Sequence, residues 1–152
     1  MSSLSKRSGA RVIGVDLFER RLTLARDLGA LDEAINPRAE NAAERIKALT
    51  ANRGADVAIE VSGATSALHD AIRATAYASR VVALGFFQGE ARGLYLGEEF
   101  HHNRVTVVSS QIGGVASELA HRWDRRRLID TIMRLQVEGV LNLRPLITDI
   151  YP

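Results

Sequence analysis

Apolar positions along the chain follow two alternating patterns. Short apolar runs predict buried parallel strands, at residues 11–15, 33–35, 56–61, 80–84 and 104–108. Between them, apolar residues recur at the three- and four-residue spacing of amphipathic helices. The first such helix spans roughly 18–28 and the last about 123–138, and Gly29 and Gly139 are placed to end them.

This alternation predicts the fold class. Strands separated by helices of this length indicate right-handed crossovers and a doubly wound, mostly parallel α/β sheet with helices on both faces. No internal repeat or low-complexity linker divides the sequence, so one domain over residues 1–152 is predicted. Residues 86–103 are less regular, and Leu94-Tyr95-Leu96 within them predicts a short edge strand.

Composition narrows the functional classes. The 152 residues are 46% hydrophobic and 25% charged, as in a folded globular protein, and the net charge of +2 is too small to indicate nucleic acid or membrane partners. No apolar stretch is long enough to span a bilayer, and residues 1–8 lack the apolar centre of a signal peptide, so a cytoplasmic location is expected. The chain has no cysteine, which removes the softest zinc ligands.

Candidate chemistry lies where the predicted strands end. In an open α/β sheet, ligands bind outside the carboxyl ends of the strands. Small or polar residues occupy those ends at Asp16, Ser62-Gly63, Leu84-Gly85 and Ser109-Ser110.

Asp16 is the most informative of these residues, and two interpretations of it are open. A carboxylate there can accept hydrogen bonds from the ribose hydroxyls of an adenosine, and it would repel a 2′-phosphate, favouring NAD over NADP. Alternatively, Asp16 is the N-cap of the helix that follows. Arg20 and Arg21 lie close by in sequence and could accommodate a phosphate.

The fingerprint that normally precedes such an acid is absent. A G-x-G-x-x-G turn lies about 20 residues before it, but only fifteen residues precede Asp16, with glycines at 9 and 14. The first strand of a dinucleotide-binding fold and its glycine-rich turn are therefore expected to be missing, and that strand is central in the order 3-2-1-4-5-6. We expect that the sheet closes up, borrows a strand from a partner chain, or is only marginally stable.

Other polar residues give weaker signals. Adjacent His101 and His102 would not share a face of a strand or helix, so they are poor co-ligands for one metal. Arg125, Arg126 and Arg127 predict a solvated helix face more than a phosphate site. Glu60, at the end of a buried strand, could contact a ligand, but capping is favoured.

Several motifs, in order along the chain, resemble the zinc-type medium-chain alcohol dehydrogenases. They are Gly9-Ala10-Arg11-Val12-Ile13-Gly14-Val15-Asp16, Ala25-Arg26-Asp27-Leu28-Gly29-Ala30, Gly54-Ala55-Asp56-Val57-Ala58-Ile59-Glu60-Val61-Ser62-Gly63, Val81-Val82-Ala83-Leu84-Gly85 and the segment from Ser109 to Gly114. The resemblance covers nearly the whole chain and implies a Rossmann-like domain that binds NAD, with NADP less favoured.

The resemblance also implies roles for particular residues. Asp16 and Arg21 would contact the adenosine ribose, Ser62 and Gly63 would form the turn beside the cofactor, Leu84 and Gly85 would pack near the nicotinamide, and Ser110 and Ile112 would bind the carboxamide. The edge at Leu94–Leu96 would pair two subunits into a homodimer.

The catalytic zinc domain of that family has no counterpart in residues 1–152, so neither a catalytic residue nor a metal ligand is assigned. The resemblance implies a parent oxidoreductase that transfers hydride between an alcohol or carbonyl compound and NAD. The alternative is a non-catalytic nucleotide-binding or dimerisation module that is inactive by itself.

Overall fold

The computed structural model describes residues 1–147 and 149–151. Helices alternate with strands along most of the chain, as the sequence predicts. The elements, in order, are α1 (Ser2–Arg7), β1 (Ile13–Val15), α2 (Glu19–Asp27), β2 (Glu33–Ile35), α3 (Ala42–Leu49), β3 (Ala55–Glu60), α4 (Thr65–Ala74), β4 (Thr75–Ala83), α5 (Glu99–His102), β5 (Thr106–Ser109), the 3-10 turn η1 (Ser117–Leu119), α6 (Arg125–Val137) and the 3-10 turn η2 (Arg144–Leu146).

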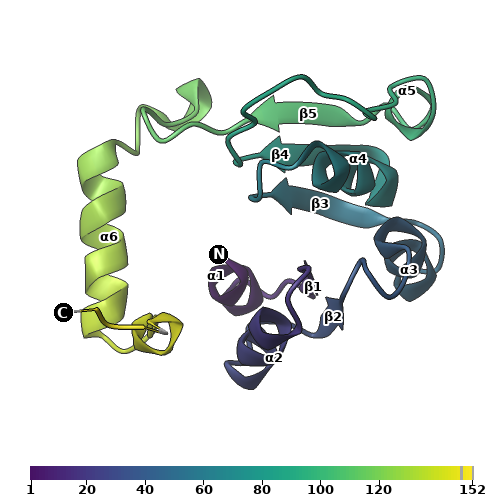
Figure 1. The fold of residues 1–152 in the computed structure, drawn as a ribbon. Coiled ribbons are helices and arrows are strands. Elements are labelled where there is room, and N and C mark those ends of the chain that lie inside the picture. Colours follow the sequence, from purple (N-terminus) through teal and green to yellow (C-terminus); the bar gives the residue numbers. More distant parts are fainter. Residues whose placement is uncertain (148, 152) are drawn as a thin grey trace. The chain divides into compact units, whose positions relative to one another are not determined.

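The chain forms two compact units, Leu4–Ser110 and Gln111–Pro152. The first contains two parallel sheets, one of order β1-β2 and one of order β3-β4-β5 (Figure 1). Each strand is joined to the next by a segment that contains a helix, which confirms the predicted Rossmann-like α/β class.

The three-stranded sheet has its core on the face covered by α4. Ile72 of α4, Val81 of β4 and Val105 are almost completely buried there. Partly buried apolar side chains surround this cluster, namely Ala58, Leu68, Ala71, Leu94 and Phe100. Because side chains alternate across a strand, this packing turns Ile59 and Val82 toward the opposite face.

The smaller sheet has its own buried residues. Ile35 of β2, Leu22 of α2 and Leu31 are buried. The next helix, α3, begins at Asn41, whose side chain accepts a hydrogen bond from the Glu44 amide at 3.0 Å and so caps the helix. Ala42 and Ala43 are buried in its first turn, and their small size permits close packing of the helix.

Two sequence-based expectations about strands are wrong in detail. β4 begins at Thr75 rather than at residue 80. Helix α4 ends there because Thr75 adopts an extended backbone conformation, with ψ 140°. Leu94-Tyr95-Leu96 forms no strand: Leu94 packs on the core, and Tyr95 contacts the His69 ring edge-on at 5.5 Å. A homodimer through this segment stays a prediction, without a strand edge to support it.

Of the three alternatives expected for the sheet, closing up is wrong. Within the described part of the chain, β1 pairs with β2 and β3 pairs with β4, but β1 does not pair with β3. Residues 2–7 form the short helix α1 and not a replacement strand. Lys6 of this helix forms an ion pair with Asp32 at 2.5 Å, which ties α1 to the loop before β2.

The second unit consists of α6 and two 3-10 turns. Asp124 caps α6, because its carboxylate accepts a hydrogen bond from the Arg127 amide at 2.7 Å. The helix agrees closely with the predicted span. Among the described residues, no helix is long and apolar enough to cross a membrane.

An ion-pair cluster joins three helices of the first unit. The Glu99 carboxylate accepts hydrogen bonds from Lys47 Nζ at 3.2 Å and from Arg73 Nε at 3.4 Å. Arg73 also pairs with Glu44 at 2.8 Å. Burial raises the pKa of Glu99, but hydrogen bonds from its own backbone and Lys47, with the charges of Lys47 and Arg73, lower it overall below the ordinary 4.5.

We expect Glu99→Gln to reduce the free energy of unfolding by about 1 kcal/mol at neutral pH, because one partner of a partly buried pair is lost. A lowered pKa in the folded chain contributes stability above pH 4.5, and this is lost as the pH falls through the lowered pKa. Urea unfolding at pH about 7 and about 3 should therefore show a smaller difference from wild type at the lower pH. Glu98→Gln is the matched control, because the neighbouring Glu98 side chain makes no cap hydrogen bond. An equal difference between Glu99→Gln and wild type at both pH values would contradict the prediction.

Candidate functional site

Asp16 directly follows β1, and its carboxylate is partly exposed. Oδ1 accepts a hydrogen bond from the Phe18 amide at 2.8 Å, and Oδ2 lies 3.5 Å from Arg21 Nη1. Its side chain keeps 30% of its surface exposed. The N-cap of α2 is Phe18 and not Asp16, so the capping interpretation is wrong. The ribose interpretation stays a prediction.

Two arginines lie over the Phe18 ring beside this carboxylate. The Arg21 guanidinium is 4.7 Å from the ring centroid, and that of Arg38, which follows β2, is 5.7 Å away. These contacts hold Arg21 between the aromatic ring and Asp16. The arrangement combines one carboxylate with two cations at the end of the two-stranded sheet.

Glu60 organises the turn that follows β3. Its side chain is buried, and Oε1 accepts hydrogen bonds from the Ser62 amide at 2.7 Å, the Ser62 hydroxyl at 2.5 Å and the Gly63 amide at 3.2 Å. The Ser62 hydroxyl oxygen in turn accepts from the Ala64 amide at 3.1 Å. The capping role favoured for Glu60 is wrong, because the N-cap of α4 is Ala64 and no side chain caps this helix. The Glu60 carboxylate instead holds the turn before α4.

Gly63 and Gly85 bring the turns after β3 and β4 into close contact. A Cβ on Gly85 would lie 2.6 Å from Glu60 Oε2 and 2.7 Å from the Gly63 Cα. Gly63 has a φ of +73°, and a Cβ there would collide with the Phe86 backbone. Both positions therefore require glycine, because a Cβ at either one would collide with neighbouring atoms. Gly63 requires it also for its left-handed backbone conformation.

The remaining predicted residues fall into two groups. The Leu84 amide donates to the Glu60 carbonyl at 2.8 Å, and the Ser110 amide donates to the Ala83 carbonyl at 2.9 Å. These bonds place Leu84 and Ser110 at the ends of β4 and β5. Ile112 lies in the second unit, where its side chain is exposed.

The structure thus gathers Ser62, Gly63, Leu84, Gly85 and Ser110 at the carboxyl end of the three-stranded sheet. Asp16 and Arg21 lie at the carboxyl end of β1 in the other sheet. Sequence reasoning did not identify Phe86, whose side chain is 80% exposed directly after this glycine contact. An aromatic residue following an apolar strand and a glycine is the signal that could have found it.

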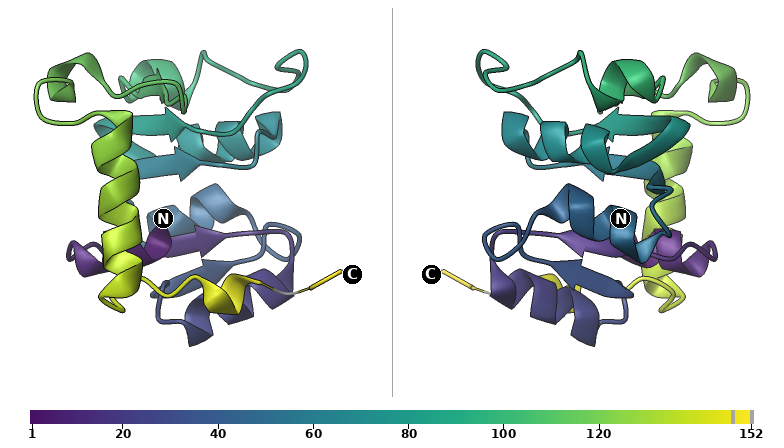
Figure 2. Two further views of the ribbon diagram at one scale, coloured as in Figure 1. Left: turned by 90° about the vertical axis from the view of Figure 1, so that its left-hand side faces the viewer. Right: turned by 90° about the vertical axis from the view of Figure 1, so that its right-hand side faces the viewer.

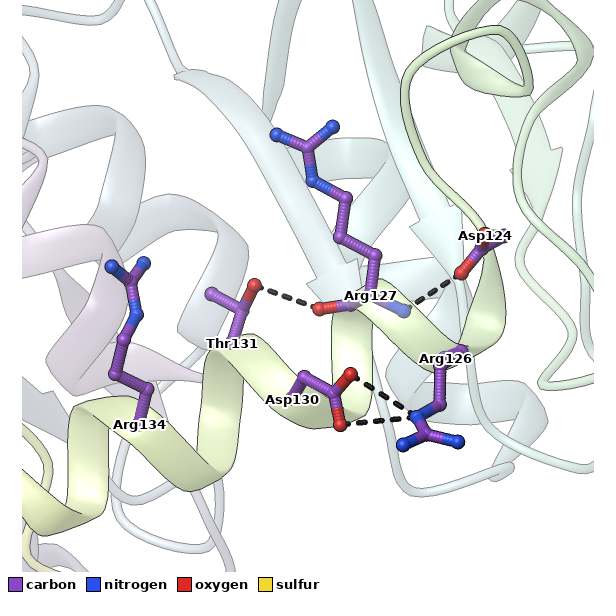
Figure 3. Close-up of a pocket in the computed structure, with 6 residues that line it drawn as sticks. All are labelled: Asp124, Arg126, Arg127, Asp130, Thr131 and Arg134. Atoms are coloured by element: carbon purple, nitrogen blue, oxygen red, sulfur yellow. Dashed lines mark hydrogen bonds and ion pairs between the residues drawn. The ribbon is translucent and has the colours of Figure 1, made fainter.

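Two surface hollows lie away from these residues. One of about 300 Å³ on α6 is lined by arginines and acids (Figure 3), and Asp130 there pairs with Arg126 at 3.1 Å. The other, of about 570 Å³, lies at the amino ends of β3 and β4, beside Thr75 and Tyr77. Neither is lined by a predicted cofactor residue. The arginines of α6 are exposed, and Arg126 pairs with Asp130 of the same helix, as expected for a solvated helix face.

Comparison with known proteins places the chain in a family. Residues 2–129 match the family described as zinc-binding dehydrogenase. The chain is 39% identical over 145 residues to D-guloside 3-dehydrogenase of Escherichia coli, a match covering 95% of this chain and 41% of that protein. It is 33% identical over 150 residues to L-threonine 3-dehydrogenase of Pyrococcus furiosus, covering 98% of this chain and 40% of that protein.

Solved structures agree in fold. A crystal structure of an NAD-dependent alcohol dehydrogenase is 27% identical with a TM-score of 0.73, covering 92% of this chain and 37% of that one. An Escherichia coli oxidoreductase of unknown specificity has a TM-score of 0.78 at 22% identity, covering 99% of this chain and 39% of that one. The chain therefore spans about 40% of the length of the curated relatives it matches. By its match over residues 2–129 and its relatives, this chain belongs to the zinc-binding dehydrogenase family.

Proposed function

We propose that this chain is the NAD-binding portion of a zinc-type alcohol dehydrogenase-like oxidoreductase. The whole protein would transfer hydride between an alcohol or carbonyl compound and NAD. The observation that carries the proposal is Asp16: a partly exposed carboxylate at a strand's carboxyl end, where α/β sheets bind nucleotides. Both relatives named above are 3-dehydrogenases of hydroxyl-bearing compounds, which supports an alcohol as substrate.

The charge of Asp16 favours NAD over NADP. Its Oδ2 oxygen has a long contact of 3.5 Å with Arg21, which leaves it able to accept a ribose hydroxyl. A 2′-phosphate at the same place would meet a like charge. Arg21 and Arg38 would offset part of that repulsion, so both cofactors belong in the test.

The other positions would contact the cofactor through their backbone. We propose that Ser62 and Gly63 border it, that Leu84 and Gly85 lie near the nicotinamide, and that Ser110 and Ile112 bind the carboxamide. The hydride chemistry is the cofactor's own. Among the described residues no group of three or more His, Asp or Glu side chains could hold a metal ion.

Calorimetric titration with NAD and NADP tests the proposal. We expect NAD to bind more tightly than NADP, and Asp16→Ala to weaken NAD binding about tenfold or more, because a hydrogen bond to a charged acceptor is lost. The same substitution should weaken NADP binding less, since it also removes the repulsion.

Asp27→Ala is the matched control, because Asp27 is an exposed aspartate at the end of the same helix, α2. It should leave NAD affinity unchanged. Failure of the folded chain to bind either cofactor would overturn the proposal for residues 1–152. Equal losses in the two variants would overturn the role of Asp16.

A further inference from the structure

The ends of β1 and β2 bring two arginines to one aromatic ring. Phe18 is the N-cap of α2, which lies beside the two-stranded sheet in both views of Figure 2. Arg21 follows it by three residues, so the two side chains lie on one face of the first helical turn. Arg38 approaches the same ring from the turn after β2. Phe18 is 50% exposed, so a bound ligand could reach this arrangement.

Asn36 fixes the position of Arg38. Its Oδ1 oxygen accepts a hydrogen bond from the Arg38 amide at 3.0 Å, and its Nδ2 group donates to Glu19 Oε2 at 3.2 Å. Because Glu19 is the first residue of α2, these two bonds tie the turn after β2 to the helix that begins beside the ring. The Phe18 ring is therefore part of a fixed contact between two strand ends.

The contact between Arg21 and Asp16 is longer than an ordinary charge-assisted hydrogen bond. Such bonds between a guanidinium and a carboxylate are about 2.7–2.9 Å long, whereas Arg21 Nη1 lies 3.5 Å from Asp16 Oδ2. The same guanidinium lies 4.7 Å from the Phe18 ring centroid, within the range in which the face of an aromatic ring attracts a cation. The ring and the carboxylate therefore compete for Arg21.

We propose that Phe18 is a positioning residue that keeps the Arg21 guanidinium from closing on Asp16 and thereby sets the preference for NAD over NADP. This inference rests on the proposed function, in which Asp16 accepts a ribose hydroxyl. A guanidinium that closed on Asp16 would occupy the acceptor oxygens and offset the charge that repels a 2′-phosphate. Without the ring, NAD would lose its acceptor and NADP would meet less repulsion.

Phe18→Leu tests the effect on cofactor preference, because leucine keeps an apolar side chain and removes the aromatic face. The Phe18 side chain makes no cap hydrogen bond, so the substitution takes none from α2. In calorimetric titrations with NAD and NADP, we expect the preference for NAD to fall about fivefold, the upper end for one cation–π contact at an exposed site.

Two further variants are the controls for this titration. Phe18→Tyr keeps the ring face and should retain the wild-type preference. Tyr77→Leu removes another exposed aromatic ring, near the amino end of β4, and should leave the preference unchanged.

A double-mutant cycle tests the positioning of Arg21 without any cofactor. Asp16→Asn and Arg21→Gln, singly and together, are compared by chemical unfolding in the wild-type chain and in the Phe18→Leu chain. In the wild-type chain, we expect the coupling between the two residues to change the unfolding equilibrium constant by less than about twofold, as for a long, exposed pair. In Phe18→Leu the pair can close, and the coupling should reach about fivefold.

The contrary outcomes are distinct. Equal coupling in the two chains would overturn this inference, and so would an unchanged cofactor preference in Phe18→Leu. A loss of preference that persists when Arg21→Gln is also present would show that the ring acts directly on the ligand, which would overturn it too. Stronger coupling in Phe18→Leu without binding of either cofactor would overturn the proposed function, while the positioning of Arg21 by Phe18 would stand.

Discussion

Replacing Gly85 with alanine is expected to lower the free energy of unfolding by about 3 kcal/mol, the upper range for overpacking a rigid site. The new methyl carbon would lie 2.7 Å from the Gly63 Cα and 2.6 Å from Glu60 Oε2, and closer still to the Gly63 amide. Gly63 cannot move away freely, because the Phe86 backbone occupies the place that a Cβ on Gly63 would take. The two turns must therefore separate, which breaks the contact between the ends of β3 and β4.

Gly89→Ala is the control for this substitution. No heavy atom lies within 4 Å of a Cβ built there, and its φ is not in the left-handed region. Chemical unfolding of both variants should show a large loss for Gly85→Ala and a change within about 0.5 kcal/mol for Gly89→Ala. Equal stability of wild type and Gly85→Ala would show that the turns can move apart at little cost.

The order of helices and strands was predictable because it depends on local patterns. Residues 33–35 and the last helix were placed almost correctly from apolar spacing and flanking glycines. The start of β4 was not, because it depends on Thr75 leaving the helix and on Ala78, which adopts a φ of 54° within the strand. Alanine at a positive φ carries no sequence signal, since alanine favours helices.

Long-range packing determines the structural features that could not be predicted from local sequence patterns. Leu94-Tyr95-Leu96 has the composition of a strand, but Leu94 is held by the α4 core and Tyr95 by His69. The separation of β1-β2 from β3-β4-β5 also depends on long-range contacts, which no local pattern encodes. The candidate site was easier to predict, because strand ends and the residues after them are visible in the sequence.

The role of Glu60 required the structure. A glutamate that ends an apolar strand can face a ligand, a helix or its own turn, and only coordinates show that Oε1 accepts three hydrogen bonds from Ser62 and Gly63. Glu60 thereby fixes the turn that borders the proposed cofactor site without itself being exposed. We assign it as a positioning residue for Ser62 and Gly63.

Glu60→Ala is expected to lower the free energy of unfolding by about 3 kcal/mol, because it removes a buried acceptor from two backbone amides and a hydroxyl. Glu60→Gln should lose only about 1 kcal/mol. Its amide oxygen can keep the Oε1 hydrogen bonds, and its NH₂ group replaces only Oε2, which has a longer 3.2 Å contact with the Gly63 amide. Glu90→Ala, which removes an exposed pair with Arg92, should change stability by less than about 0.5 kcal/mol.

Amide hydrogen exchange separates positioning of the turn from general destabilisation. Relative to wild type, Glu60→Ala should accelerate exchange of the Ser62 and Gly63 amides much more than exchange of the core amides of β4. Only the turn loses its hydrogen-bond acceptor. If all amides accelerate equally, Glu60 acts on the whole unit and not on the turn. If neither stability nor exchange changes, the hydrogen bonds to Ser62 and Gly63 are replaced by water at no net loss, and the turn that borders the proposed nicotinamide position is fixed by the contact between Gly63 and Gly85 alone.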